Sequence, residues 1–262
     1  MVVSGRFSGS CGPVALCLHG FPDFWASLEP LASRINPNGR NVFLDLRGFG
    51  DSALRGPGHD YRLSSVANDI TAAIDWLGVD KVTFVGHDWG AAVGWLLWMR
   101  NPAAIARYFL LSSPNPYAFF EAMQDPQQWE MSAYARDLAR SESGEALEIA
   151  ELSRWTDNPN HREALEDALS KSSPSARSGY YGQNYPQSKK ALDLPVVKGK
   201  RPLLLVYGMD DPYIASRSYE LSRSFATEDC RIRGINGGHF IHFNNSDEVA
   251  DIFHEWVNQD GR

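Results

Sequence analysis

Residues 82–92 read Val-Thr-Phe-Val-Gly-His-Asp-Trp-Gly-Ala-Ala. The β-branched and aromatic residues at the start predict a buried strand, and the small residues at the end predict the beginning of a helix. Between them, Gly86 and Gly90 flank Asp88 at the spacing of a nucleophile elbow, a sharp turn that presents a reactive side chain. An aspartate there favours attack on a saturated carbon, which forms an alkyl ester that water must hydrolyse. Epoxides and alkyl halides are therefore the leading substrate classes.

The composition excludes several other classes of function. The chain has 262 residues and a formal charge of −7, which argues against nucleic acid and anionic membranes as partners. Its three cysteines, Cys11, Cys17 and Cys230, show no metal-ligand spacing and leave an odd count. We therefore expect no disulfide framework and a reducing compartment. Because no apolar run of 18 residues and no signal-peptide pattern occurs, we expect a cytoplasmic protein without membrane insertion.

Short apolar runs alternate with amphipathic runs along most of the chain. The apolar runs predict strands at residues 14–18, 41–46, 81–86, 107–111, 202–207 and 230–235. The amphipathic runs predict helices at residues 25–34, 64–77, 91–100 and 247–258. Residues 1–13 have room for one short strand at most. This alternation predicts an α/β fold, a mostly parallel sheet with helices on both faces.

The segment 117–190 interrupts this alternation. It is polar and shows no strand pattern, and its periodicity predicts helices near residues 127–140, 144–154 and 161–170. We interpret residues 1–116 and 191–262 as the core, and residues 117–190 as a compact helical cap inserted between two strands of that core.

Further along the chain, two loops supply the partners that a carboxylate nucleophile needs. Hydrolysis of the ester requires a base for water and an acid that orients the base, and in this fold the order is nucleophile, acid, histidine. Asp211 follows the strand predicted at 202–207, and His239 follows two glycines after the last predicted strand. Asp88, Asp211 and His239 are therefore the candidate triad, with His239 as the base.

Each member of this triad has an alternative. Asp88 would also suit the N-cap of the following helix. Asp210 competes with Asp211 for the orienting role, and His242 competes with His239 for the role of base. We favour the triad members because of the elbow glycines and the positions at strand ends.

The loop that begins at His19 is expected to complete an oxyanion hole. Such a hole needs two backbone N–H groups aimed at one point. We assign one to Trp89, the residue after the nucleophile, and the other to Phe21. Pro22 is a candidate for a cis peptide bond, and His19 and His87 are interpreted as structural.

Three stretches together resemble the α/β-hydrolase-fold epoxide hydrolases. They are His-Gly-Phe-Pro-Asp at residues 19–23, Asp-Leu-Arg-Gly-Phe-Gly-Asp-Ser at residues 45–52 and Gly-His-Asp-Trp-Gly at residues 86–90. The resemblance covers roughly residues 14–116 and 200–258. It implies attack of Asp88 on the less hindered epoxide carbon, then hydrolysis to a vicinal diol. It also implies a small apolar epoxide and water as the partners, with no metal or organic cofactor.

The resemblance further implies two cap tyrosines that bind the epoxide oxygen and donate a proton as the ring opens. The chemistry asks for such an acid, because an unprotonated alkoxide is a poor leaving group. Tyr134 and Tyr181 match the family's positions, and Tyr180 and Tyr185 are alternatives for the second one. Family members usually carry a strand hairpin before the His-Gly-Phe-Pro strand, so the sheet edge is expected to be trimmed or covered, in a monomer or homodimer.

Three other functions stay open. Haloalkane and haloacid dehalogenases of the same fold also use an elbow aspartate, and Trp89 could donate an N–H group to the halide. However, their residue after His-Gly is often Asn or Glu, where this chain has Phe21, and a halide needs no acid. A non-catalytic receptor would keep the pocket, but it would have no use for His239. An enzyme that opens an epoxide intramolecularly could also dispense with His239.

Overall fold

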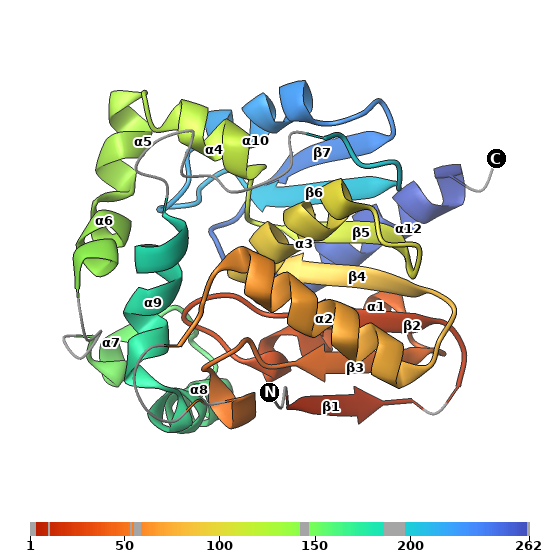
Figure 1. Cartoon of the computed structure of the whole chain (residues 1–262), viewed down its shortest axis with the longest axis horizontal. Helices are drawn as coiled ribbons and strands as arrows, with labels where there is room; N and C mark the ends of the chain where they lie inside the picture. The colour runs from red at the N-terminus through yellow and green to blue at the C-terminus, as the bar shows by residue number, and fades with distance from the viewer. Residues whose placement is uncertain are drawn as a thin grey trace.

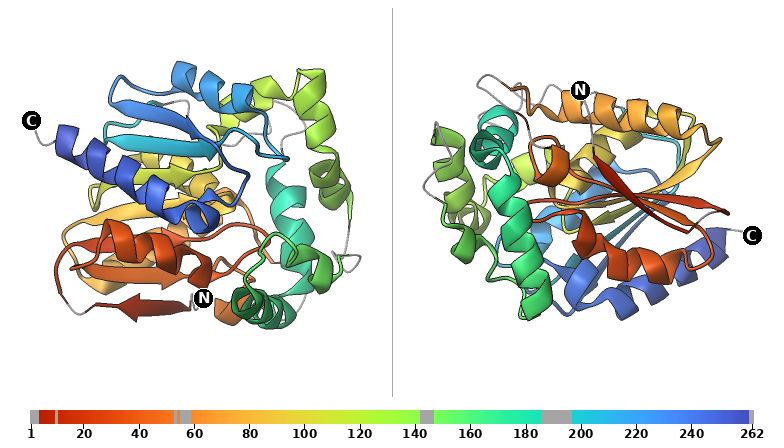
Figure 2. Two further views of the ribbon diagram at one scale, coloured as in Figure 1. Left: turned by 180° about the vertical axis from the view of Figure 1, so that it is seen from behind. Right: turned by 90° about the horizontal axis from the view of Figure 1, so that it is seen from below.

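A seven-stranded sheet lies between two layers of helices in the computed structural model of the chain (Figure 1, Figure 2). The structure describes residues 4–9, 11–52, 54, 59–141, 147–185 and 197–260. The strand order is β1-β3-β2-β4-β5-β6-β7, and only β1, at one edge, runs antiparallel to its neighbour. The strands are β1 Gly5–Ser8, β2 Val14–Leu18, β3 Arg40–Leu44, β4 Val82–His87, β5 Ile105–Leu111, β6 Leu203–Gly208 and β7 Cys230–Ile235. The predicted mostly parallel sheet and the single short strand before residue 14 are thus confirmed.

Helices cover both faces of the sheet, as the alternation in the sequence predicted. On one face lie α2 (Leu63–Leu77) and α3 (Trp89–Arg100), and on the other lie α1 (Glu29–Ile35) and α12 (Ser246–Asp260) (Figure 2). Helix α2 buries Val66, Ile70 and Ile74 on one side, because residues three and four apart share a helix face. The central strands β5 and β6 are almost wholly apolar, which is typical of parallel strands buried on both sides.

A group of helices lies between β5 and β6 in the sequence. Figure 1 shows most of them at the left edge of the sheet, where the parallel strands end. They are α4 Pro116–Ala122, α5 Pro126–Met131, α6 Ala133–Arg140, α7 Ile149–Leu152, α8 Pro159–Lys171 and α9 Pro174–Asn184. Within the described parts of this insertion there is no strand.

The sequence predictions for this insertion were only partly right. The helix predicted at 127–140 is two helices that meet at Ser132, and of the one predicted at 144–154 the described residues are helical only over Ile149–Leu152. Residues 144–146 and the proposed boundary at 190/191 lie outside the described residues. Helices α4 and α9 were missed.

A local signal marks the helices that were missed. Helices α4, α5, α8 and α9 all begin at a proline preceded by Asn, Asp or Ser. Proline suits the first helical position, and those polar residues suit the N-cap, so this pair of residues identifies four helix starts in the sequence. Similarly, the helix predicted at 25–34 begins as a 3₁₀ turn, Trp25–Leu28, before α1.

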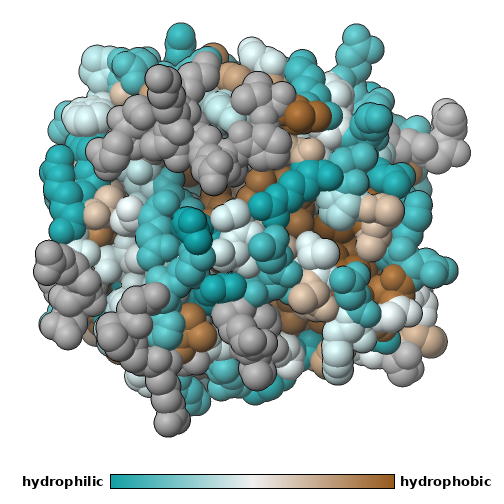
Figure 3. All heavy atoms as spheres, viewed as in Figure 1, coloured by the Kyte–Doolittle hydropathy of each residue, from teal (hydrophilic) through white to brown (hydrophobic). Residues whose placement is uncertain are grey.

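The outer surface mixes residue types. On the face shown in Figure 3, hydrophilic residues cover most of the surface, and hydrophobic residues are visible between them. Among the described residues, Trp76 on α2 is 77% exposed and Phe7 on β1 is 52% exposed, and their rings lie 6.4 Å apart. None of the described helices combines the length and the apolar character needed to cross a membrane.

Candidate active site

The turn between β4 and α3 has the geometry of a nucleophile elbow. Asp88 sits at φ 49° and ψ −115°, outside the usual regions for a residue with a side chain. The turn is possible only with glycine on each side. A Cβ on Gly86 would lie 2.6 Å from the Gly90 carbonyl oxygen, and one on Gly90 would lie 2.1 Å from that of Leu18. Asp88 does occupy the N-cap position of α3, but its side chain makes no capping hydrogen bond, so the position does not commit the carboxylate to the helix.

The two oxygens of the Asp88 carboxylate face different groups. Oδ1 accepts a hydrogen bond from the backbone N–H of Phe21 at 2.7 Å. Oδ2 lies 3.6 Å from Nε2 of His239, and the side chain is 15% exposed. The carboxylate is therefore held in place by one oxygen, while the other lies beside the imidazole of His239.

His239 and Asp211 lie directly behind this carboxylate. Nδ1 of His239 donates to Oδ2 of Asp211 at 2.8 Å, and the same oxygen accepts from the hydroxyl of Tyr219 at 2.8 Å. The other oxygen of Asp211 accepts from the backbone N–H groups of Tyr213 and Ile214. Four donors thus converge on Asp211. Although burial opposes its charge, His239 and these hydrogen bonds lower the pKa of Asp211.

The charges around His239 favour its protonated form. Burial alone would lower the pKa of the imidazole, but the carboxylates of Asp211 and Asp88 outweigh burial and raise the pKa of His239 to about 10. With Nδ1 committed to Asp211, Nε2 is the ring atom that faces Asp88.

The structure separates these residues from their sequence alternatives. Asp210 is exposed, and its backbone N–H bonds to the carbonyl of Gly237. His242 is fully buried, with Nε2 3.2 Å from an oxygen of Asp23. Neither residue faces Asp88. The geometry therefore does not support Asp210 as the orienting acid or His242 as the base.

The loop after β2 carries Phe21 to the elbow, and His19 holds this loop. Nε2 of His19 accepts from the backbone N–H of Leu46 at 3.0 Å, so Nδ1 carries the proton that it donates to the carbonyl of Gly20 at 2.7 Å. Asp45 supports the same loop by accepting from the backbone N–H of Trp25. The Phe21–Pro22 peptide bond is cis. His19 thus has the structural role expected from the sequence.

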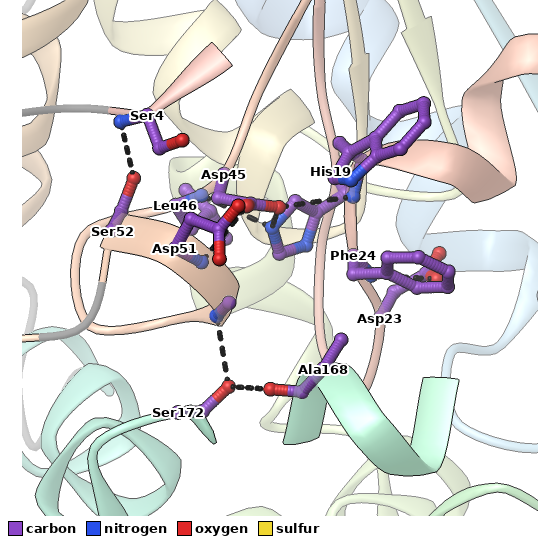
Figure 4. Close-up of polar contacts among 12 residues, drawn as sticks. Ser4, His19, Asp23, Phe24, Asp45, Leu46, Asp51, Ser52, Ala168 and Ser172 are labelled. Carbon is purple, nitrogen blue, oxygen red and sulfur yellow. Dashed lines mark hydrogen bonds and ion pairs between the residues drawn. The ribbon is translucent and has the colours of Figure 1, made fainter. Parts of the chain in front are cut away.

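The loop at residues 45–52 also contacts the inserted helices. The hydroxyl of Ser172 accepts from the backbone N–H of Gly50 at 3.0 Å and donates to the carbonyl of Ala168 at 2.8 Å (Figure 4). Next to it, the backbone N–H of Ser173 donates to the carbonyl of Gly48 at 2.7 Å. The stretch 45–52 therefore joins the oxyanion loop on one side to helices α8 and α9 on the other.

Two tyrosines of the inserted helices face the elbow. Tyr134 comes from α6 and Tyr181 from α9, and their ring centroids lie 6.0 Å apart. Tyr181 also packs edge-on against Phe21 and Trp89. Burial of the hydroxyls is the main cause that raises the pKa of both tyrosines well above the usual value, although Tyr134 as a whole residue is 38% exposed. The next cause is Tyr181 for Tyr134 and the charge of Asp88 for Tyr181, and both tyrosines keep their protons.

The other tyrosines considered from the sequence are engaged elsewhere. The hydroxyl of Tyr180 donates to the carbonyl of Arg47 at 3.1 Å, and that of Tyr185 bonds to the sulfur of Met123 at 3.2 Å. A third tyrosine was missed: the ring of Tyr213 packs against Tyr134 at 5.2 Å and against His239 at 5.3 Å. Its position two residues after Asp211 is the only feature of the sequence that indicates a place in the site.

Two cavities open beside Asp88 and His239. One has a volume of about 90 Å³ and the other of about 580 Å³. Tyr134, Tyr181 and Tyr213 line both, so the tyrosines stand at the junction. A substrate that fills the two cavities would pass over the nucleophile and the base.

A buried cluster of Asp23, His87 and His242 lies behind His239. Their potential ligand atoms lie within 4.8 Å of one another, a set that could hold a divalent cation by ligand type. His87 Nε2 donates to the carbonyl of His239 at 3.1 Å, and burial lowers the pKa of His87 and His242. In the described part of the chain, Nδ1 of each has no hydrogen-bond partner. Positions so far apart in the sequence share no motif, so only the fold reveals this cluster.

Comparisons with known proteins agree with this architecture. The α/β-hydrolase fold family matches residues 13–246. Over 268 residues the chain is 28% identical to "Epoxide hydrolase 2" of Caenorhabditis elegans, a match that covers 95% of this chain and 75% of that protein. Over 123 residues it is 35% identical to "Epoxide hydrolase 4" of Mus musculus, with 47% of this chain and 34% of that protein covered.

Solved structures show the same fold at lower identity. The chain is similar to a Bacillus megaterium epoxide hydrolase in complex with an inhibitor, with a TM-score of 0.85, 21% identity, and 98% and 96% of the two chains covered. A thermophilic esterase from Thermogutta terrifontis is also similar, with a TM-score of 0.68, 19% identity, and 98% and 93% covered. Because this likeness extends to an esterase, it bears on the fold and leaves the reaction to the chemistry of the site.

Proposed function

The chain belongs to the α/β-hydrolase fold family, and on that premise we propose that it hydrolyses epoxides to vicinal diols through an ester on Asp88. One observation carries the proposal, which is the placement of the Asp88 carboxylate. Oδ1 is bound by Phe21 N–H at 2.7 Å, while Oδ2 lies 3.6 Å from Nε2 of His239, and Asp88 lines a cavity. The names of the matched relatives support the same reaction class. The segment 117–190 would act as the cap that supplies the acids.

In the first step, Oδ2 of Asp88 attacks one epoxide carbon, and the bond from that carbon to the ring oxygen breaks. Tyr181 and Tyr134 hydrogen-bond the ring oxygen, and Tyr181 donates the proton that the leaving oxygen needs. Their raised pKa values keep this proton available at neutral pH. The products of the step are a neutral ester on Asp88 and a tyrosinate.

Formation of the ester changes the character of His239. In the resting site two carboxylates raise the pKa of the imidazole to about 10, so it is an imidazolium at neutral pH. The ester removes the charge of Asp88, so the pKa of His239 falls and its proton passes to the tyrosinate. His239 is then neutral, and it becomes a base only when there is an ester to hydrolyse.

In the second step, His239 takes a proton from water, and the hydroxide attacks Cγ of Asp88. Oδ1 becomes the oxyanion, which the N–H of Phe21 stabilises together with the N–H of Trp89. As the ester bond breaks, the leaving alkoxide takes the proton of the new carboxylic acid on Asp88 and departs as the diol. The site returns to a carboxylate, an imidazolium and a neutral tyrosine. One epoxide and one water yield one diol, so every proton is accounted for.

The experiment that tests this proposal is His239→Gln, which removes the base for the second step. The variant is incubated with a mixed panel of epoxides and haloalkanes, and intact mass spectrometry reads the product. An epoxide adds its whole mass to the protein, whereas a haloalkane adds its mass less hydrogen halide. Peptide digestion then locates the modification. A whole-epoxide adduct at Asp88 is the expected result, and an adduct at any other residue contradicts the mechanism.

One observation favours haloalkane dehalogenation as the second candidate. The indole Nε1 of Trp89 is buried and makes no hydrogen bond of ideal geometry, although it lies close enough to the hydroxyl of Tyr181 to lower the pKa of that tyrosine, and it could turn to a halide instead. Against this, a departing halide needs no proton, so the hydroxyls of Tyr134 and Tyr181 would have no catalytic role. An alkyl adduct from haloalkanes alone would establish this alternative. A receptor on this fold would instead bind ligands unchanged after Asp88→Ala and would form no adduct.

A further inference from the structure

We propose that Asp23, His87 and His242 form a buried binding site for a divalent transition-metal ion, and that Zn²⁺ is the ion that suits them best. Two imidazole nitrogens and one carboxylate oxygen are ligands of the kind that Zn²⁺ binds in proteins. The ion would have a structural role, because it would lie behind His239 and would take part in no step of the reaction.

The three side chains come from separate parts of the fold and meet at one point. Asp23 follows β2, His87 ends β4, and His242 lies on α11 (Ile241–Asn244), and none of them is more than 1% exposed. Around a tetrahedral Zn²⁺ with bonds of about 2.0–2.1 Å, two ligand atoms lie about 3.3 Å apart. Nε2 of His242 and Oδ2 of Asp23 already lie 3.2 Å apart. The ligand atoms all lie within 4.8 Å of one another, so an ion would draw the other pairs together by at most about 1.5 Å.

The hydrogen bond of His87 leaves its other nitrogen free to bind a metal. Nε2 lies 3.1 Å from the carbonyl oxygen of His239, and because a carbonyl only accepts, Nε2 carries the proton. Nδ1 is then an unprotonated acceptor, and it is buried with no hydrogen-bond partner among the residues that the structure describes. Metal-binding histidines usually donate their other ring N–H to a carbonyl or a carboxylate. His87 therefore has the tautomer and the orientation of a metal ligand.

His242 has an unused nitrogen as well. Its Nδ1 is buried and has no hydrogen-bond partner in the described part of the chain. Burial lowers the pKa of His242 and of His87, so both imidazoles are neutral at neutral pH, which is the form that binds metals. A bound ion would thus not have to displace a proton charge from either ring.

Asp23 places a carboxylate in the same buried region without a cation beside it. Its Oδ1 accepts from the backbone N–H of Phe24 at 2.8 Å, and its Oδ2 accepts from the hydroxyl of Ser27 at 2.6 Å. Over the described ranges, no lysine or arginine nitrogen lies within 4 Å of it, and its ion-pair partner His242 is a neutral imidazole. Buried carboxylates are usually paired with a cation or coordinate a metal. A divalent ion would supply the missing positive charge.

The position of this site gives the ion a clear structural effect. Its three ligands are one to three residues away from Phe21, Asp88 and His239 in the sequence. One ion would therefore hold together the loop of the oxyanion donor, the elbow and the loop of the base. Because these segments separate when the chain unfolds, the ion should bind the folded state far more tightly and should stabilise it.

Titration of the metal-free protein with Zn²⁺ tests this inference. The protein is dialysed against a chelator and then incubated with Zn²⁺ for hours, because a buried site must open to admit the ion. We expect one Zn²⁺ per chain to survive gel filtration, measured by plasma mass spectrometry, and the Tm to rise by at least about 3 °C. Co²⁺ in place of Zn²⁺ should give the visible absorption of a four- or five-coordinate ion. Failure to retain Zn²⁺, or a Co²⁺ spectrum of the octahedral hydrated type, overturns the proposal.

A pair of histidine variants identifies the ligands. His242→Gln removes one ligand but keeps an amide N–H group that can donate to Asp23, and it should lose both the retained ion and the rise in Tm. His161→Gln is the matched control, because His161 is partly buried nearby, packs on Phe24, and has an unpartnered Nε2 in the described structure, yet lies outside the ligand set. It should keep the ion. If both variants keep the ion, or both lose it, the assigned ligands are wrong. If His242→Gln does not fold, Asp23→Asn replaces it with the same expected result.

Discussion

Replacement of Asp211 by asparagine should stall the enzyme after its first step. Four donors point at the two oxygens of Asp211, among them His239 Nδ1–H and the hydroxyl of Tyr219. An amide offers one oxygen and an NH₂ group, so two of these donors would face another donor. His239 can relieve the conflict by moving its proton to Nε2, and that tautomer cannot accept a proton from water.

The size of the effect follows from the charges. The rise in the pKa of His239 from 6.5 to about 10 corresponds to about 5 kcal/mol of net stabilisation of the imidazolium. In the ester intermediate Asp88 is neutral, so Asp211 alone stabilises the imidazolium that forms as water is deprotonated. Loss of most of this stabilisation, about 4 kcal/mol, would slow hydrolysis about 10³-fold. The attack of Asp88 on the epoxide needs no proton from His239 and should slow far less.

Single-turnover experiments measure the two steps separately. Enzyme in excess over epoxide is quenched at intervals, and intact mass spectrometry follows the formation and decay of the ester on Asp88. The ester should accumulate in Asp211→Asn, while in Asp210→Asn, an exposed neighbour, its decay should change less than about threefold. If Asp211→Asn slows ester formation and ester decay equally, or if Asp210→Asn is the more damaging change, then the assignment of Asp211 is refuted.

Three further predictions concern single groups of the site. Tyr181→Phe should slow ester formation by about 10²-fold. Tyr180→Phe loses only a hydrogen bond to the carbonyl of Arg47 and should change the rate of ester formation less than about threefold. Rapid-quench kinetics measures the rate of ester formation in both variants. Because the pKa of His239 is raised from 6.5 to about 10, its contribution to the free energy of unfolding is complete below pH 6.5 and is lost as the pH rises through 10. In urea titrations the parent should therefore exceed His239→Gln in stability by more at pH 6 than at pH 10, and an equal difference at both pH values would contradict the charge assignment. Gly20→Ala places a Cβ 2.3 Å from that of Asp88 and should reduce ester formation by about 10²-fold, whereas Gly238→Ala, whose Cβ meets nothing within 4 Å, should retain activity in the same assay.

Local patterns in the sequence predicted the core and the order of its chemistry. The elbow at residues 86–90 is recognisable because its two glycines are required by contacts within the turn and with the adjacent strand. The six core strands appear within two residues of their predicted positions, because apolar runs bounded by turn residues carry that information locally. The order of Asp88, Asp211 and His239 could likewise be predicted, since each follows a recognisable strand.

The choice between neighbouring residues depended on tertiary structure. Tyr180 and Tyr181 are adjacent on α9, and consecutive helical residues point about 100° apart, so one faces Arg47 and the other faces the elbow. Likewise, Asp210 is exposed and Asp211 is buried, although both follow the same strand. In the sequence each pair consists of two identical residues.

No pattern in the sequence predicted the contacts between segments that lie far apart in the chain. The cluster of Asp23, His87 and His242 and the approach of Tyr213 to Tyr134 join segments separated by dozens of residues. The unequal cavities also arise only where the helices between β5 and β6 pack over the ends of the strands. The sequence by itself therefore determined which reactive groups the chain carries and in what order. Tertiary packing alone decided which of them meet and what size of substrate can reach them, because both depend on distances across the fold.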